Sequence, residues 1–149
     1  MRVWRAAPDE APAVAALLGA FRDHLGYDQP SDASLLASVE RIIGRDDAEY
    51  LLAGERDPVG VAQVRYRWSV WWDAEDCWLE DLYVRPEARG EGVGRTLTQA
   101  VIDRATERGC RRVELDVNSE NPAAMALYQS LGFDTGNTGG QDIFMRRKL

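Results

Sequence analysis

Hydrophobic positions in the first third of the chain recur at two different spacings. Residues 2–5 alternate polar and apolar side chains, which is typical of a short strand. Apolar residues then recur every three or four positions over residues 14–25 and again over residues 35–43, which predicts two helices. A turn with an N-cap at residues 8–9 precedes the first helix, and Gly44 ends the second. The predicted order is strand, helix, helix.

The middle of the chain is rich in residues that favour strands. Residues 50–53 predict a strand, residues 54–58 a turn, and residues 59–72 a long strand dense in Val, Tyr and Trp. The acidic residues 73–76 are expected to break this strand, and residues 77–84 predict the next one. The pattern therefore favours antiparallel hairpins in this region.

The last third alternates between helix and strand signals. A glycine-rich turn at residues 89–94 leads into a helix that ends at Gly109, and residues 112–117 alternate strictly, as a strand buried on one face does. Asn121 is an N-cap for a last helix that ends at Gly132. Weaker strand signals lie near Phe133 and over residues 142–146, on either side of a turn at residues 136–140.

Composition narrows the class of protein. The 149 residues are 45% hydrophobic and 29% charged, which predicts one α/β or α+β domain over residues 1–149. Two cysteines and one histidine provide neither a disulfide framework nor a structural zinc site, so no metal is expected. No segment resembles a signal peptide or a membrane span, so the expected location is cytoplasmic, without a membrane partner.

The net charge of the chain indicates which kinds of molecule it can bind. A net charge of −7 repels phosphodiester backbones, which makes nucleic acid a poor partner. Arginine and aromatic residues alternate over residues 65–68, but in a strand they face opposite ways and do not form a stacking platform. We expect no nucleic-acid function.

The sharpest chemical signal is a glycine-rich segment between a predicted strand and a predicted helix. Amide groups at a helix N-terminus, exposed by glycines, suit a phosphate or pyrophosphate group. The segment fits neither a P-loop nor a dinucleotide fingerprint, and a surface turn that binds nothing is the alternative interpretation. Its members are Arg89, Gly90, Glu91, Gly92, Val93, Gly94 and Arg95.

Three stretches in order resemble the GNAT superfamily of acetyl-CoA-dependent N-acetyltransferases. Residues 79–86, Leu-Glu-Asp-Leu-Tyr-Val-Arg-Pro, look like the central strand of that family. Residues 89–94 fit its Q/R-x-x-G-x-G/A pyrophosphate loop, and residues 121–133 are similar to its second motif. The Leu-Glu-Asp stretch is also found in the branch that acetylates polyamines and other small amines, which this chain resembles most.

The resemblance implies a mixed, mostly antiparallel central sheet flanked by helices, in which the central strand and residues 112–117 splay apart. The cleft so formed takes acetyl-CoA: main-chain groups of Leu82, Tyr83 and Val84 pair with the pantetheine arm, and amides of residues 89–95 hold the pyrophosphate. Asn121 could also reach the cofactor, and its role as an N-cap is compatible with that.

The implied reaction is direct attack of an amine on the acetyl thioester, which requires a base because aliphatic amines are protonated at neutral pH. Glu80 is the candidate base. Alternation places it on the face of Trp78 and Leu82, an apolar neighbourhood that would raise its pKa. The alternative is a surface carboxylate. Asp81 falls on the opposite face with Leu79 and Tyr83, where it would orient the substrate or be structural.

Other candidates carry smaller roles. The resemblance makes Tyr128 the acid that protonates the departing thiolate, while its helical spacing also suits a core tyrosine. Cys77 and Cys110 lack an activating histidine, so inert thiols are favoured over nucleophiles. His24 is expected to be solvated or to line the substrate pocket.

The acceptor pocket is expected between the first two helices, their loop and the hairpin before the central strand. Carboxylates beside aromatic rings suit an ammonium group, which favours a small di- or polyamine. An aminoglycoside-like antibiotic, a protein amine, or a sensor that binds acyl-CoA without turnover are the alternatives. The tryptophan-rich hairpin could equally form a homodimer surface. The residues expected in the pocket are Asp23, Tyr27, Asp28, Trp68, Trp71, Trp72, Asp73, Glu75, Asp76 and Asp81.

Overall fold

The computed structural model describes residues 1–136, 139–140 and 142–149. Contacts divide the chain into two compact units, Met1–Asp116 and Val117–Leu149, and each is described by itself. Of the helices in the described part of the chain, none combines the length and the apolar content that crossing a bilayer demands.

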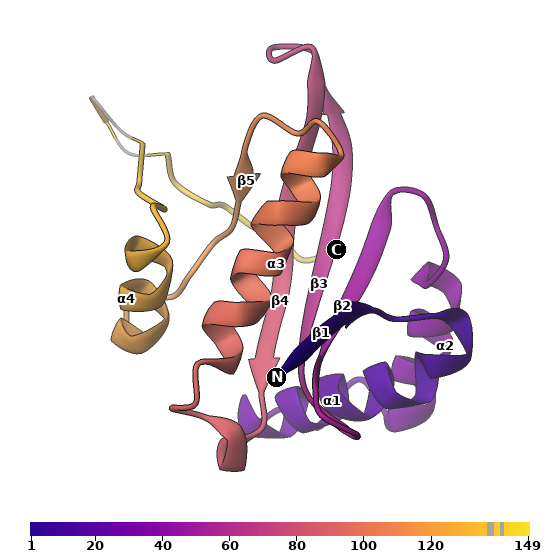
Figure 1. Cartoon of the computed structure of the whole chain (residues 1–149). Coiled ribbons are helices and arrows are strands. Elements are labelled where there is room, and N and C mark those ends of the chain that lie inside the picture. Colours follow the sequence, from indigo (N-terminus) through magenta and orange to yellow (C-terminus); the bar gives the residue numbers. More distant parts are fainter. Residues whose placement is uncertain (137–138, 141) are drawn as a thin grey trace. The chain divides into compact units, whose positions relative to one another are not determined.

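The first unit is built on one five-stranded sheet in the order β1-β2-β3-β4-β5 (Figure 1). Each of the first four strands pairs antiparallel with the next, and β5 pairs parallel with β4. This mixed, mostly antiparallel sheet confirms the predicted fold class. The strands are β1 (Arg2–Arg5), β2 (Ala48–Gly54), β3 (Pro58–Ser69), β4 (Ala74–Val84) and β5 (Val113–Glu114).

Helices cover both faces of the sheet, with α3 in front and α1 and α2 behind in the view of Figure 1. Neighbouring residues of β2 show the two faces: Glu49 pairs with Arg104 of α3, while Tyr50 packs with Val14 of α1 and Val39 of α2. The helices are α1 (Ala11–His24), α2 (Asp32–Ile42) and α3 (Val93–Glu107), and two short 3-10 turns are η1 (Pro8–Glu10) and η2 (Pro86–Ala88).

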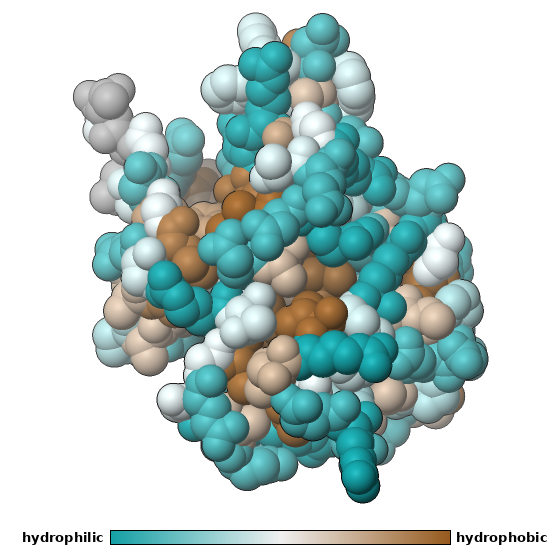
Figure 2. Space-filling model, in the orientation of Figure 1, coloured by the Kyte–Doolittle hydropathy of each residue, from teal (hydrophilic) through white to brown (hydrophobic). Residues whose placement is uncertain are grey.

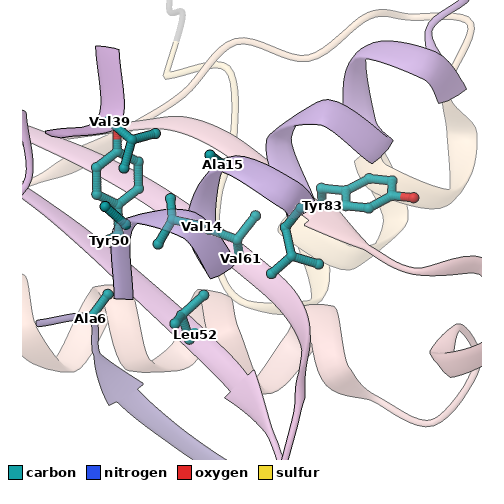
Figure 3. Close-up of a cluster of buried hydrophobic side chains, with 10 residues drawn as sticks. Ala6, Val14, Ala15, Val39, Tyr50, Leu52, Val61 and Tyr83 are labelled. Carbon is teal, nitrogen blue, oxygen red and sulfur yellow. The ribbon is translucent and has the colours of Figure 1, made fainter. Parts of the chain in front are cut away.

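The apolar stripes of α1 and α2 form a core against the rear face of the sheet. Figure 3 shows members of this cluster, in which Tyr50, Leu52 and Val61 of the strands lie beside Val14 of α1. Tyr83 of β4 completes it from the neighbouring strand. In contrast, the surface in Figure 2 is mostly hydrophilic, with smaller hydrophobic areas toward the middle of that face.

Within its described residues, the second unit contains one helix, α4 (Pro122–Ser130). The Asn121 side chain accepts a hydrogen bond from the Ala124 amide at 3.1 Å, so its predicted N-cap role is observed. After the helix, the amide of Phe133 donates to the carbonyl of Tyr128 at 3.0 Å.

Several predicted strand boundaries differ from the structure. The expected break after the long strand occurs, but it is a turn at residues 70–73 rather than 73–76, because β3 ends at Ser69 and β4 begins at Ala74. Glu75 and Asp76 lie inside β4, where they pair with Arg108 and Arg112, each at 2.9 Å. The strand predicted over residues 112–117 is only Val113–Glu114. Within the described residues after α4, no strand forms near residue 133 or over residues 142–146. Part of the predicted 136–140 turn lies outside the described residues.

A buried carboxylate joins α3 to the front of the sheet. Glu49 is 5% exposed, and Arg104 donates from Nε and Nη2 to its two oxygens, the latter at 2.6 Å. The hydroxyl of Tyr66 donates to the same carboxylate at 3.2 Å, and Arg5 lies 3.6 Å away. Burial works to raise the pKa of Glu49, but these partners outweigh it and hold the pKa below the usual range.

Replacing Glu49 with glutamine should lower the free energy of unfolding by about 2 kcal/mol, because Arg104 loses its charged partner. The cost stays below that of a fully buried pair, since the Arg104 side chain is 35% exposed. Urea denaturation measures it. Asp47→Asn, which removes an exposed ion pair with Arg45, is the control and should leave stability nearly unchanged. Equal losses in both variants would contradict the assignment.

Candidate active site

A β-bulge in β4 determines which side chains reach each face of the sheet. In the backbone register between β3 and β4, Asp81 stands opposite Gln63 and Leu79 stands opposite Val64. Glu80, between them, is an extra residue that no residue of β3 stands opposite. Because paired residues share a face, Asp81 lies on the α1 side with Tyr83, and Leu79 lies on the α3 side. The expectation that Leu79, Asp81 and Tyr83 share one face is therefore wrong.

Glu80 lies in a polar environment. Its side chain is 42% exposed, and Arg65 Nε donates to Glu80 Oε2 at 3.1 Å. The apolar surroundings expected from strict alternation are wrong, because the bulge at this residue interrupts the alternation.

Asp81, the next residue, has the raised pKa that was expected of Glu80. The Gln63 amide, oriented by its hydrogen bonds, donates to Asp81 Oδ2 at 3.1 Å and accepts from Arg65 Nε at 3.2 Å. Burial, and secondarily the negative charges of Glu80 and Asp116, raise the pKa of Asp81 to about 6, while Arg65 opposes the rise. A carboxylate with this pKa is suited to proton transfer near neutral pH.

Asp81 lines a pocket of about 270 Å³ between the sheet, α1, α2 and their connecting loop. Tyr50 and Gln63 line it from the sheet, and Tyr27 lines it from the loop. The pocket thus contains two of the ten residues expected to line it, Tyr27 and Asp81.

The tryptophan-rich hairpin is not part of this pocket. Trp72 lies in the turn between β3 and β4, at the opposite end of β4 from Val84, and the Arg112 guanidinium is 5.3 Å from its ring centroid (Figure 1). Glu75 and Asp76 are engaged in ion pairs with arginines. These hairpin residues therefore do not supply free carboxylates to the pocket.

The N-terminus of α3 has the geometry expected of an anion site. Gly90 and Gly92 adopt φ angles of +82° and +81°, and Gly92 caps the helix without a side-chain hydrogen bond. The first helical amides, those of Val93 and Gly94, have no carbonyl acceptor within the helix. A Cβ added at Gly90 or Gly92 meets no atom within 4 Å, so the space beside these two residues is open.

Arg89 fixes this loop to the end of β4. Its Nε donates to the carbonyl of Val84 at 2.9 Å, and its guanidinium lies 5.7 Å from the ring centroid of Tyr83. The Arg89 side chain is therefore directed back toward β4. Its contacts hold the loop in place, so that the loop amides, rather than the Arg89 guanidinium, are available to an anion.

The edge of β4 beside this loop is open. The ladder between β4 and β5 consists of Cys77 with Val113 and Trp78 with Glu114. Among the described strands, none pairs with residues 79–84 on that side. Unpaired backbone donors and acceptors at a sheet edge can bind an extended ligand that carries amides, as the pantetheine arm does. These residues fit acetyl-CoA by that criterion.

Cys77 is buried, whereas Tyr128 and Cys110 are partly exposed. Burial raises the pKa of Tyr128, whose ring centroid is 5.7 Å from that of Phe133. Burial also raises the pKa of Cys77 to about 12 and raises that of Cys110, which is the opposite of an activated thiol. The ring of His24 is 6.2 Å from that of Tyr83. The described residues contain no cluster of three or more potential metal ligands.

Comparison with known proteins identifies the family. The sequence profile of the acetyltransferase (GNAT) family matches residues 14–133. The chain belongs to this family. A crystal structure from Arthrobacter sp. FB24, assigned as an acetyltransferase, superposes with a TM-score of 0.90 and 30% identity over 100% of this chain and 96% of that one.

Curated relatives differ in what they acetylate. The thialysine N-epsilon-acetyltransferase of Bos taurus is 38% identical over 50% of this chain and 43% of its own length, so this chain spans less than half of that relative. The aminoglycoside N(6′)-acetyltransferase type 1 of Stenotrophomonas maltophilia is 31% identical over 87% of this chain and 84% of its own.

Sequence reasoning missed the residues that surround Asp81. Gln63 and Arg65 determine its hydrogen bonding and that of Glu80, and Tyr50 lines the same pocket. A signal for one of them was present: Gln63 is a polar residue within an otherwise apolar run of strand residues. A polar residue in a buried strand commonly has a specific partner.

The Asp81 carboxyl should titrate near pH 6, whereas Asp47, which is bonded to Arg45, should titrate at about 2. In Gln63→Leu the pKa of Asp81 should rise further, because the substitution removes a donor that stabilises the charged carboxylate. Carbon NMR of the side-chain carboxyls measures both values. A pKa of Asp81 near 4 in the wild type would refute this description of its surroundings.

Proposed function

We propose that this protein transfers the acetyl group of acetyl-CoA to a primary amine of a small molecule. The observation that carries the proposal is the arrangement of β4. Its unpaired edge over residues 79–84 adjoins the glycine loop at the start of α3, and the same strand places Asp81 in a pocket suited to an amine. One strand thereby serves both substrates.

In this proposal, backbone groups of Leu82, Tyr83 and Val84 hold the pantetheine arm, and amides of residues 89–95 hold the pyrophosphate. A helix N-terminus without a side-chain cap favours a pyrophosphate by its dipole and its free donors. Acetyl-CoA supplies the reactive thioester. An amide of Leu82 or Tyr83 would stabilise the negative charge that develops on the thioester oxygen.

Two adjacent carboxylates compete for the role of base, and we favour Asp81. Its raised pKa, near 6, leaves it ionised at neutral pH and able to accept the proton of the attacking amine. Glu80, the base expected from the sequence, is exposed and paired with Arg65. Glu80 remains the alternative, acting through water, and in either case its charge contributes to the raised pKa of Asp81.

Tyr128 is retained as the acid that protonates the thiolate of CoA. Its raised pKa keeps the phenol protonated at neutral pH, as an acid requires. Asn121 caps α4 through its side-chain oxygen, and its side-chain NH2 group can still donate a hydrogen bond to the cofactor.

A cytoplasmic location and a homodimer are further parts of the proposal. Trp71, which is 91% exposed, supports a dimer surface at the β3–β4 turn.

The comparisons support two classes of acceptor. A small amine, including a di- or polyamine, is supported by the thialysine acetyltransferase relatives. An aminoglycoside amine is the second candidate, supported by the Stenotrophomonas maltophilia relative that aligns over most of both chains. A sensor that binds acetyl-CoA without turnover is the non-enzymatic alternative.

The central test is amine-dependent release of CoA from acetyl-CoA, measured across small amines, polyamines, aminoglycosides and short peptides. The rate should rise with pH through about 6, because Asp81 must lose its proton to act as a base. Asp81→Asn should lower kcat by roughly 100-fold, and Glu80→Gln by less than about tenfold.

The variants also distinguish the alternatives. A loss of activity confined to Glu80→Gln would assign the base to Glu80. Tight binding of acetyl-CoA without release of CoA by any amine class would indicate the sensor instead.

The glycine loop gives a separate prediction about CoA binding. Gly92→Ala should raise the Kd for CoA about tenfold, because an added Cβ strains the loop and obstructs the amides. Gly109→Ala is the matched control, since Gly109 follows the other end of α3 with a φ of +86° and the same free space. Calorimetry should show weaker CoA binding only for Gly92→Ala; equal weakening in both variants would refute the cradle.

A further inference from the structure

The acceptor pocket offers one carboxylate that is free to bind a cation. Of the charged side chains that line it, Arg22 is already paired with Asp23 and Asp32, each at 2.8 Å, and donates to the carbonyl of Pro30 at 2.7 Å. Asp81 forms no ion pair within the described part of the chain, and its bond to Gln63 is to a neutral group. An ammonium that enters the pocket therefore has one charged partner.

The remaining wall of the pocket is mainly apolar. Helices α1 and α2 contribute Leu18, Leu35 and Ile42, and the loop between the helices contributes Leu25 and Pro30. The volume, about 270 Å³, lies below the about 300–1,000 Å³ of pockets that take drug-sized ligands. A short hydrocarbon arm gains free energy by leaving water in such a space.

A second ammonium would be costly in this pocket, because it would be transferred from water into apolar surroundings without a partner. Among the described residues that line the pocket, Asp81 is the one carboxylate, so the wall itself offers no second acidic partner. Asp32 of α2 is already paired with Arg22. The many charges of a polyamine or an aminoglycoside thus have no matching set of carboxylates here.

We infer that the preferred acceptor is a primary monoamine with a short apolar arm, whose ammonium binds Asp81 and whose arm lies against Leu25, Leu35 and Ile42. This inference rests on the proposed function and specifies its acceptor. It excludes a second positive charge on the arm.

Two amines with the same six-carbon chain test the monoamine preference directly. Hexylamine and 1,6-diaminohexane differ only in the second amino group, and both are ammonium ions at about pH 8. The expected kcat/KM for hexylamine is at least about tenfold higher, after allowance for the two equivalent amines of the diamine. Release of CoA measures both rates.

A designed carboxylate should reverse this preference. Ser38 of α2 lines the pocket, so Ser38→Glu adds a partner for the distal ammonium and should shift the ratio of the two kcat/KM values about tenfold toward the diamine. Ala37→Glu is the control, because it adds the same charge at an exposed α2 position that does not line the pocket. The control should leave the ratio unchanged.

The outcomes separate this inference from the proposed function. Acetylation of the diamine, spermidine or kanamycin with a higher kcat/KM than hexylamine would overturn the monoamine preference and leave the proposed reaction intact. An identical shift in both glutamate variants would also overturn it, by showing a long-range charge effect. Failure of every amine to release CoA from a protein that binds acetyl-CoA would overturn the proposed function, and this inference with it.

Discussion

One unpaired residue in β4 is the constraint on which the candidate site depends. No residue of β3 stands opposite Glu80 in the backbone register of the sheet. The side chains before and after Glu80 therefore do not follow the usual alternation between the two faces. Leu79 can then pack beneath α3 while Asp81 and Tyr83 face α1. A regular strand would direct Leu79 to the face of Asp81 and would bring a different set of side chains beneath α3. The bulge thus allows an apolar core and an acidic pocket to share neighbouring residues of one strand.

The helix that carries the anion site is fixed to the sheet at both ends. Near its C-terminus, Arg104 binds the buried Glu49. Near its N-terminus, the helix approaches β3 so closely that a Cβ at Gly60 would lie 2.9 Å from Leu97 Cδ1 and 3.0 Å from Val93 Cγ1. Amides held in place before a ligand arrives lose little entropy when it binds. The absence of a side chain at Gly60 therefore contributes to the proposed CoA site, which lies on another segment.

Local signals in the sequence were sufficient for most elements. Helical periodicity predicted α1, α2 and α3, and the glycine loop was located because its spacing is local. Long-range effects were not predictable in this way. The acidic start of β4 suggested a break, because the arginines that neutralise it lie more than thirty positions later in the chain. A bulge shifts alternation by one residue and leaves no mark on composition, so the surroundings predicted for Glu80 and the face predicted for Leu79 were wrong, while Asp81 does share a face with Tyr83 as predicted.

Apart from Tyr50, Gln63 and Asp81 of the sheet, the walls of the pocket come from a different stretch of the chain than the cradle of α3. Residues of α1, α2 and their loop supply most of the surroundings of the proposed acceptor, while the proposed donor is held by β4 and the start of α3. Mutations in the first stretch can accumulate without disturbing the handling of the thioester. Divergence within such a scaffold is therefore asymmetric: the molecule that receives the acetyl group can change repeatedly in evolution while the molecule that delivers it stays the same.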